Sequence, residues 1–449
     1  MGRLFGTDGA RGVANVELTA ELAMNIGRAA AMVLVNDEVK HPTILIGKDT
    51  RLSGDMLEGA LIAGFCSVGA NVKLLGVVPT PAVAYLVKKY NADAGVMISA
   101  SHNPFEFNGI KIFSSEGYKL PDELENKIEE IVLDNAVPYA IAKDGEIGRV
   151  TTLENAVDDY IDHVVEAVGE DLSGMEVALD CSNGSSSRTA EKLFTKLGVK
   201  VHMLFDEPDG VNINNDCGST HTEKLQEYVR KNNLCAGLAF DGDADRCLAV
   251  DENGELVDGD FLIAICANDM KKNGTLKNNA AVGTVMTNMG FSKFCKDNDI
   301  DFVATKVGDR YVLESMLKNG YNIGGEQSGH IIFLDHSTTG DGELSGAMVL
   351  AIMKRTGEKL SELAKVMERY PQVLINVKVS NESKNLFNTD EKIKEEVNCV
   401  TETLGDTGRI LIRVSGTEPL VRVMIEGENL ELITKLAQEA ADVVRERLA

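Results

Sequence analysis

Positive charge is scarce in this sequence. The 449 residues include 45 Lys and Arg against 70 Asp and Glu, so the formal net charge is −25 with the histidines neutral. Nucleic-acid backbones and anionic lipid surfaces attract basic protein faces. The charge balance therefore excludes nucleic acid and a membrane surface as the main partner. Taken alone, it also argues against an anionic small-molecule ligand.

Long hydrophobic runs are absent as well. The longest uncharged stretches, such as residues 59–72, span about 14 residues and include Ser and Asn, whereas a membrane-crossing helix needs roughly 20 apolar residues. The opening residues, MGRLFGTDGARG, contain no hydrophobic signal core. We therefore expect neither a membrane anchor nor a secretion signal.

Paired cysteine motifs are also missing. None of the 8 cysteines forms a CxxC pair, and they are scattered along the whole length. In a chain of this size, such spacing indicates reduced thiols rather than a disulfide framework. We therefore expect a cytoplasmic protein.

Proline is sparse, with 9 residues, whereas glycine is abundant, with 42, and 44% of the chain is hydrophobic. This apolar fraction is typical of a globular protein, and abundant glycine suits α/β folds, in which short loops join strands to helices. At roughly 150 residues per domain, the length alone indicates about three domains.

Strand-like and helix-like segments alternate over the first 150 residues. Residues 42–49, 71–81 and 94–99 have strand character, and residues 54–69 carry apolar residues at helical spacing. Pro121 is expected as the first residue of an amphipathic helix over residues 121–135. This rhythm predicts a largely parallel sheet with ligands at the carboxyl ends of its strands.

Further strands recur at intervals: residues 175–180, 235–241, 280–286 and 322–326. The sequence pattern changes near residue 370. The segments after it alternate polar and apolar residues with period two, and a helix is expected over residues 430–448. That pattern predicts a small antiparallel α+β domain. We therefore predict four domains, with the boundaries 1–150, 151–252, 253–369 and 370–449.

Two of these strands are similar to each other. AGVMIS precedes one polar loop and AGLAFD precedes another. The similarity could reflect a duplicated α/β unit, although shared strand chemistry alone produces the same echo.

The first of four polar loops with chemical potential is ISASHNP, residues 98–104. A hydroxyl such as that of Ser101, beside His102, could serve as a nucleophile or a phosphate acceptor. A capping turn is the alternative, because Ser and Asn favour turns. No GxSxG elbow surrounds any serine, which disfavours an α/β-hydrolase.

The second loop, DGDADR, places Asp241, Asp243 and Asp245 at alternate positions after a strand. Carboxylates this close repel one another unless a cation lies among them, and oxygen ligands suit Mg²⁺ or Ca²⁺. An EF-hand is excluded because its sixth position, which requires glycine, holds Arg246, and because CLAVD after it has strand character. A solvated acidic turn is the remaining alternative to a metal site.

Two more loops complete the set. GGEQSGH, residues 324–330, combines donors and acceptors that suit sugar hydroxyls, with a plain hairpin turn as the alternative. RVSGTEP, residues 413–419, with Arg422 after it, is rich in donors that suit a phosphate, with a surface turn as the alternative. No Walker sequence occurs. Together the four loops predict metal-assisted phosphoryl transfer on a phosphorylated sugar.

The motifs of the chain also resemble those of a known family. RLFGTDGARG, ISASHNP with NGIK after it, DGDADR, KVGDRYV, GEQSGH and RVSGTEP occur in the order found in the α-D-phosphohexomutases, over essentially the full length. The amino-acid sequences of GEQSGH and of the opening motif are most similar to those of the glucosamine branch of this family. The resemblance implies three related α/β units with mixed, mainly parallel sheets and a smaller C-terminal α+β domain, arranged around a central cleft.

The resemblance also implies roles for individual residues. Ser101 would be phosphorylated in the active enzyme, and one Mg²⁺ per chain would be held by the three aspartates and the phosphate on Ser101. Further residues near the reacting groups would be Arg11, His102, Lys111, Arg246 and His330, with Lys111 or His330 assisting proton transfer. The sugar would be bound by Glu326, Ser328, Gly308 and Asp309. The second phosphate would be bound by Arg413, Ser415, Gly416, Thr417 and Arg422.

The implied reaction interconverts glucosamine 6-phosphate and glucosamine 1-phosphate through a 1,6-bisphosphate, on the route to UDP-N-acetylglucosamine and cell-wall precursors. The phosphomannomutase and phosphoglucomutase branch is the first alternative. A non-catalytic sugar-phosphate binder and a metal-dependent phosphatase are less favoured. A homodimer could form through exposed helices of the first domain.

The resemblance also changes the reading of the net charge. Seven basic residues lie in or near the motifs: Arg11, Lys111, Arg246, Lys306, Arg310, Arg413 and Arg422. Local field rather than net charge decides what enters a cleft. The net charge of −25 therefore does not exclude an anionic sugar as ligand.

Overall fold

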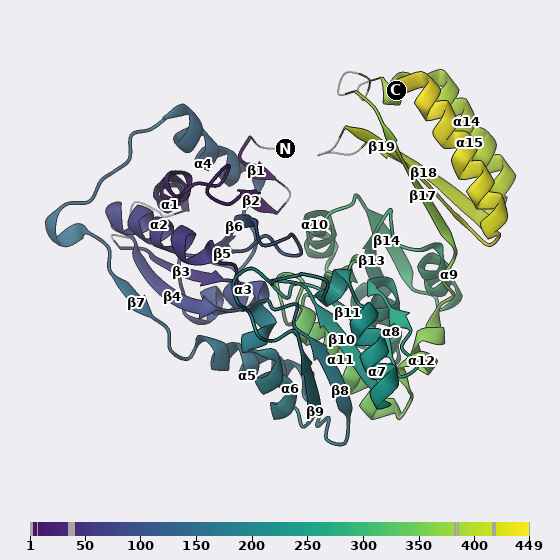
Figure 1. The fold of residues 1–449 in the computed structure, drawn as a ribbon, viewed down its shortest axis with the longest axis horizontal. Helices are drawn as coiled ribbons and strands as arrows, with labels where there is room; N and C mark the ends of the chain where they lie inside the picture. The colour runs from purple at the N-terminus through teal and green to yellow at the C-terminus, as the bar shows by residue number, and fades with distance from the viewer. Residues whose placement is uncertain are drawn as a thin grey trace. The chain divides into compact units, whose positions relative to one another are not determined.

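The computed structural model describes residues 3–6, 8–34, 41–380, 383, 386–414 and 419–448. They form two compact units. The first comprises residues up to 286 and 298–366, and the second comprises residues 287–297 and 367 onward. Figure 1 shows the elements of both units along the chain.

The first sheet has seven strands in the order β1-β2-β6-β5-β3-β4-β7. The strands are β1 (Phe5–Gly6), β2 (Gly9–Val13), β3 (Thr43–Lys48), β4 (Asn71–Val77), β5 (Ala94–Ile98), β6 (Phe107–Ser114) and β7 (Val150–Thr152). The central strands β3, β4 and β5 are parallel, as is β7, whereas β6, β2 and β1 are antiparallel to their neighbours. The parallel centre arises because each strand is followed by a crossover helix.

Helices cover both faces of this sheet (Figure 1). They are α1 (Ala20–Leu34), α2 (Gly54–Ser67), α3 (Thr80–Lys89) and α4 (Asp122–Asp134). The apolar faces of α1, α2 and α4 pack on one side, in a core that includes Ile26, Leu61 and Ile128. Pro121 was expected as the first residue of α4, but it precedes the helix. Its backbone is extended at ψ 153°, and its carbonyl oxygen accepts from backbone N–H groups of the first helical turn.

The second sheet has the order β12-β11-β10-β8-β9. Its strands are β8 (Glu176–Asp180), β9 (Lys200–Leu204), β10 (Ala236–Phe240), β11 (Cys247–Asp251) and β12 (Leu256–Val257), with α5 (Ala156–Val168), α6 (Ala190–Lys196) and α7 (Glu223–Asn232) as its helices. Strands β8, β9 and β10 are parallel, and β11 and β12 are antiparallel. The start of β11 directly after Arg246 confirms the strand that excluded an EF-hand.

The third sheet has the order β14-β13-β15-β16. Its strands are β13 (Ala280–Thr284), β14 (Asp301–Thr305), β15 (Ile323–Gly325) and β16 (Ile331–Phe333). The neighbouring helices are α8 (Gly259–Lys272), α10 (Asp309–Asn319), α11 (Gly342–Thr356) and α12 (Leu360–Leu363), whereas α9 (Met289–Asp297) belongs to the second compact unit. Only β16 is antiparallel to its neighbour in this sheet.

The second compact unit contains an entirely antiparallel sheet in the order β17-β19-β18. Its strands are β17 (Gln372–Lys378), β18 (Gly408–Val414) and β19 (Leu420–Gly427), and its helices include α14 (Glu391–Leu404) and α15 (Leu430–Leu448). Val421 and Val423 pack against Ala440 and Val444 of α15. Three mixed, mainly parallel sheets and one antiparallel sheet confirm the predicted fold class. The exact domain boundaries stay a prediction.

Two further findings concern the thiols and the helices of the described residues. All 8 cysteines are described and all are free. Among the described residues, no helix is both long and apolar enough to cross a membrane.

Helices α1 and α2 cross closely because of glycine. A Cβ added at Gly64 of α2 would lie 2.2 Å from the carbonyl oxygen of Met24, whereas one added at Gly59, on the same helix, would meet nothing within 4 Å. We expect Gly64→Ala to lower the free energy of unfolding by about 1–3 kcal/mol through overpacking. Gly59→Ala should raise it by about 0.4–1 kcal/mol. Urea unfolding of both variants tests this, and equal effects would contradict the close packing.

Candidate active site

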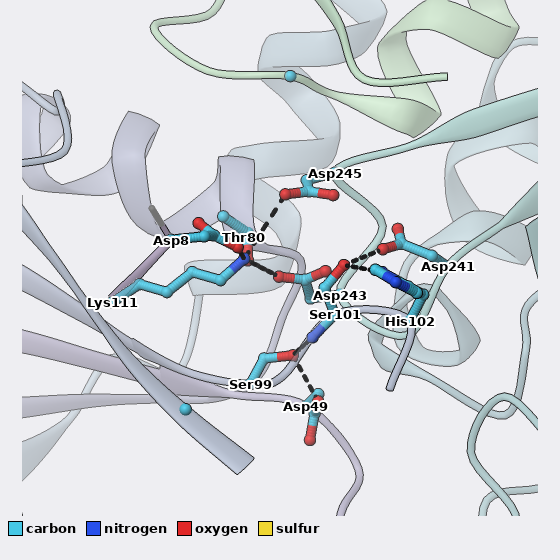
Figure 2. A network of polar contacts seen from close by, with 12 residues as sticks. Asp8, Asp49, Thr80, Ser99, Ser101, His102, Lys111, Asp241, Asp243 and Asp245 are labelled. Carbon is cyan, nitrogen blue, oxygen red and sulfur yellow. Dashed lines mark hydrogen bonds and ion pairs between the residues drawn. The ribbon is translucent and has the colours of Figure 1, made fainter. Parts of the chain in front are cut away.

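Three of the predicted loops occupy equivalent places in their sheets. Residues 99–106 join β5 to β6, residues 241–246 join β10 to β11, and residues 326–330 join β15 to β16. In each case the first strand has a parallel neighbour on one side and its antiparallel successor on the other. The strands AGVMIS and AGLAFD, which are similar in sequence, therefore also have equivalent positions in their sheets. Figure 2 shows how side chains from the first two of these loops meet.

Ser101 lies at the centre of the contact network. Its side chain is fully buried, and Oγ donates a hydrogen bond to Oδ2 of Asp241 at 2.5 Å. The backbone of Ser101 is left-handed, at φ 53°. Gly242 allows the metal loop to approach this turn, since a Cβ there would lie 2.5 Å from the Ser101 carbonyl oxygen. The hydroxyl predicted to react is thus held against the predicted metal loop.

The carboxylates of Asp241, Asp243 and Asp245 form a buried cluster, and one oxygen of each lies within 4.8 Å of the others. Oδ1 of Asp243 and Oδ1 of Asp245 are buried without a hydrogen-bond partner among the described residues. Burial, followed by the charges of Asp245 and Asp243, raises the pKa of Asp241 well above its usual range. Three mutually repelling carboxylates, two of them with an unsatisfied oxygen, fit a hard divalent cation such as Mg²⁺.

Lys111 of β6 provides a cation at this cluster. Its Nζ lies 2.7 Å from Oδ2 of Asp243, 3.0 Å from Oδ2 of Asp8 and 3.6 Å from Oδ2 of Asp245 (Figure 2). Burial by itself would lower the pKa of Lys111, but Asp243 and then Asp8 outweigh it and raise that pKa. Lys111 is therefore held as an ammonium ion.

Asp8 connects Lys111 to two further basic side chains. It pairs with Arg11 and with Lys119, and Lys119 in turn contacts Asp309 at the start of α10. Burial opposes ionisation of Asp8, but Lys111, Lys119 and Arg11 lower its pKa well below the usual range. These pairs join the first sheet to the third within the first unit.

His102 is neutral in this arrangement. Nη1 of Arg246 lies 3.2 Å from its Nδ1, and Ser101 Oγ lies 3.4 Å from the same atom. Burial, followed by the charges of Arg246 and Arg11, lowers the pKa of His102 to about 4. Nδ1 of His102 is therefore an acceptor, and the Arg246 guanidinium is the cation on this side of Ser101.

His330 is the last residue of the GGEQSGH loop and is almost fully buried. The backbone N–H of Gly340 donates to its Nε2 at 3.0 Å, and its Nδ1 lies 3.5 Å from Oδ2 of Asp245. Burial opposes the charged form, but Asp245 and Asp309 raise the pKa of His330. A proton added at Nε2 would be stabilised by both carboxylates and would require the Gly340 contact to break.

The predicted sugar-binding residues also come together. The backbone N–H of Gly308 donates to Oε1 of Glu326 at 3.0 Å, which ties the start of α10 to the β15–β16 loop. Ser328 is exposed at the tip of that loop. A cavity of about 150 Å³ opens beside Lys119, Asp309 and His330.

The predicted phosphate loop lies in the second unit. Arg413 and Arg422 are directly opposed in the antiparallel register of β18 and β19, so both side chains leave the same face. Ser415, Gly416 and Thr417 lie outside the described residues.

Four family models match the chain in order. They describe the phosphoglucomutase/phosphomannomutase alpha/beta/alpha domains I, II and III and the C-terminal domain, and match residues 2–137, 158–254, 258–370 and 374–443. The chain belongs to the phosphohexomutase family.

Curated relatives of this phosphohexomutase match over the full length. The phosphoglucosamine mutase of Acetivibrio thermocellus is 57% identical over 448 residues, covering 100% of both chains. That of Clostridium novyi is 55% identical over 447 residues, covering 100% of this chain and 99% of its own.

Solved structures share the fold at lower identity. A phosphoglucomutase/phosphomannomutase family protein of Burkholderia thailandensis has a TM-score of 0.82 at 22% identity, covering 99% of this chain and 97% of that one. An N-acetylphosphoglucosamine mutase of Aspergillus fumigatus, crystallised with GlcNAc-6P and magnesium, has a TM-score of 0.73 at 17% identity, covering 99% and 96%.

Several residues of this phosphohexomutase site were not predicted. Asp8 lies within the RLFGTDGARG motif, which was a usable signal, but nothing near Lys119 in the sequence marks it. Thr80, at the start of α3, donates through Oγ1 to Oδ2 of Asp243 at 2.5 Å, and its N–H donates to the Asp243 carbonyl at 2.9 Å. Its contacts with Asp243 depend on the packing of the first sheet against the second.

The three-aspartate cluster generates a direct test of metal binding. We expect Asp243→Asn to weaken Mn²⁺ binding by at least about tenfold, because an amide replaces an anionic oxygen donor beside two others. Electron paramagnetic resonance titration of free Mn²⁺ measures this without any turnover. Asp158→Asn, at an exposed aspartate paired with Lys192, is the matched control. Unchanged affinity in Asp243→Asn would remove Asp243 from the metal site.

Proposed function

We propose that this protein is an isomerase that interconverts glucosamine 6-phosphate and glucosamine 1-phosphate, with Ser101 carrying a phosphoryl group. The observation that carries the proposal is the buried Ser101 hydroxyl, held 2.5 Å from a carboxylate of a buried three-aspartate cluster. Full-length relatives at 54–57% identity are phosphoglucosamine mutases, which supports the amino sugar as substrate.

The proposed reaction has two transfers. In the first, the free sugar hydroxyl loses its proton as its oxygen bonds to phosphorus, the bond between phosphorus and Ser101 Oγ breaks, and Oγ takes up a proton, giving glucosamine 1,6-bisphosphate. After the bisphosphate reorients, Ser101 Oγ attacks its other phosphate, and the released sugar oxygen takes up a proton. No phosphate is released and no phosphate is consumed, so the net change is an isomerisation.

The fixed cations of the site support these transfers. Phosphoryl transfer depends mainly on in-line positioning and on neutralising the equatorial oxygens. Arg246 lies on the His102 side of Ser101, and Arg11 and Lys111 lie with Asp8. In our proposal, these preorganised charges stabilise the negative charge as it spreads in the transition state.

We assign proton transfer to His330 rather than to Lys111. The three carboxylates around Lys111 hold its proton, so the amine is a poor base. Nε2 of His330 accepts from one backbone N–H, which a substrate hydroxyl would have to replace, and Asp245 and Asp309 would stabilise the resulting imidazolium.

The remaining loops bind the substrate in our proposal. Glu326 and Ser328, with Gly308 and Asp309, would contact the sugar hydroxyls. Arg413 and Arg422, with Ser415, Gly416 and Thr417, would bind the phosphate that does not react. Two guanidinium groups on one face of a strand pair can donate together to the oxygens of a bound phosphate.

One Mg²⁺ per chain, held by Asp241, Asp243, Asp245 and the phosphate on Ser101, would supply Lewis-acid neutralisation of the transferred group. The A. fumigatus mutase crystallised with GlcNAc-6P and magnesium supports this choice of ion. The eight free cysteines support a cytoplasmic location, on the route to UDP-N-acetylglucosamine and cell-wall precursors. A homodimer stays a prediction.

The phosphoserine proposal predicts a clear mutant phenotype. Ser101→Ala should lose mutase turnover by at least about 10³-fold, because no oxygen remains to carry the phosphoryl group. The fold and Mn²⁺ binding should persist, because the aspartates are intact. A coupled assay and circular dichroism check both expectations, and substantial residual turnover in this variant would remove Ser101 from the donor role.

The substrate assignment predicts a preference for the amino sugar. We expect kcat/KM on glucosamine 1-phosphate to exceed that on glucose 1-phosphate by about tenfold or more. The same coupled assay should detect no free phosphate. Comparable kcat/KM values would favour the phosphoglucomutase alternative, and phosphate release would indicate a phosphatase.

A further inference from the structure

Arg51, in the loop between β3 and α2, is buried among the carbonyl groups of the Ser101 turn. Its side chain is fully enclosed. Nη2 donates to the carbonyl oxygens of Ser101 and Asn103, both at 2.8 Å, and Nη1 donates to those of Pro104 and Phe107. One guanidinium therefore binds three carbonyls of the loop between β5 and β6 and one at the start of β6.

Asp49 completes the arrangement at the carboxyl end of β3. Its Oδ2 accepts from Nε of Arg51 at 2.8 Å, so all five N–H groups of the guanidinium are used. The same oxygen accepts from Ser99 Oγ at 2.6 Å, and Ser99 Oγ accepts from the backbone N–H of Ser101 at 2.9 Å (Figure 2). Asp49 and Arg51 thus hold the backbone of Ser101 from both its N–H and its C=O side.

The Ser101 turn needs such support. A left-handed backbone at a non-glycine residue is disfavoured and persists only where the surroundings enforce it. Asn214 of the second α/β domain adds one more restraint, since its Nδ2 donates to the Ser101 carbonyl at 2.9 Å. None of the hydrogen bonds that Arg51 donates is to the aspartate cluster, so they act on the Ser101 turn itself.

We propose that Arg51, braced by Asp49 and Ser99, is a positioning residue that fixes the direction of the Ser101 oxygen for phosphoryl transfer. The inference rests on the proposed function of Ser101. Arginine is required because its planar fork donates along several directions at once, whereas a lysine has three donors on one nitrogen. A displacement of about 1 Å at a reacting atom can cost roughly 100-fold in rate.

Arg51→Lys in the full-length phosphorylated protein tests the proposal, since it keeps the positive charge beside Asp49. We expect kcat to fall by about 100-fold while KM for glucosamine 1-phosphate stays within about threefold. The ³¹P resonance of phospho-Ser101 should broaden or split, because the turn samples several conformations. A role limited to stability would leave kcat and the ³¹P resonance of the folded fraction unchanged.

Arg28→Lys is the matched control. Arg28 is a half-buried arginine of α1 that bonds Ser67 and packs over Tyr139, so it carries the same chemical change away from the site. We expect its kcat and ³¹P resonance to match those of the parent protein. An Arg51→Lys variant that stays within about twofold of the Arg28→Lys variant in kcat would overturn the proposal.

Ser99→Ala keeps the proposal testable if Arg51→Lys does not fold. It removes the acceptor for the Ser101 N–H and one donor to Asp49 while both members of the buried ion pair remain, and we expect kcat to fall by about tenfold at constant KM. A kcat within about twofold of the parent value would count against the proposal. Intact-mass measurement of the parent protein during turnover distinguishes failure of the proposed function from failure of the role of Arg51. A parent protein that turns over without phosphate on Ser101 would refute the proposed function.

Discussion

Repulsion among the carboxylates of Asp241, Asp243 and Asp245 is the constraint on which the rest of the site depends. The three groups are buried in one short loop, and their repulsion must be offset by nearby cations. Lys111 comes from the first sheet and Arg246 from the metal loop itself. The three-aspartate loop is therefore stable only where the first and second sheets pack together. A divalent ion would complete the compensation of its negative charge.

A repeated sheet topology delivers these groups to one place. In each of the three α/β domains, a loop leaves the end of a parallel strand and returns as an antiparallel strand. That geometry leaves the end of the parallel strand accessible, which is where ligands bind in open α/β sheets. Backbone contacts such as Cys247 N–H to Gly329 C=O, at 3.0 Å, couple the metal loop to the sugar loop. The three loops are thus positioned by backbone as much as by side chains.

Local charge, rather than net charge, governs the site. The chain carries −25 overall, yet Arg11, Lys111, Lys119 and Arg246 all lie around Asp8 and the three aspartates. Much of their positive charge is matched by those carboxylates, so charged groups of both signs alternate in the site. A phosphate and a divalent metal ion can bind there together, because the charge of each compensates that of the other.

The sequence by itself determined several of the strands and helices and indicated the candidate loops. Apolar runs and period-two alternation depend on local patterning, so β5, β10 and the helix Leu430–Leu448 were predicted closely. The motifs likewise indicated Ser101, the three aspartates and Arg246, since their chemistry is carried by adjacent residues. The tertiary structure alone decided which distant groups meet them. Thr80 on Asp243, Lys119 between Asp8 and Asp309, and Arg51 under Ser101 are contacts across 50 to 190 positions. No local pattern encodes such pairs, because they form only when separate sheets and loops pack together.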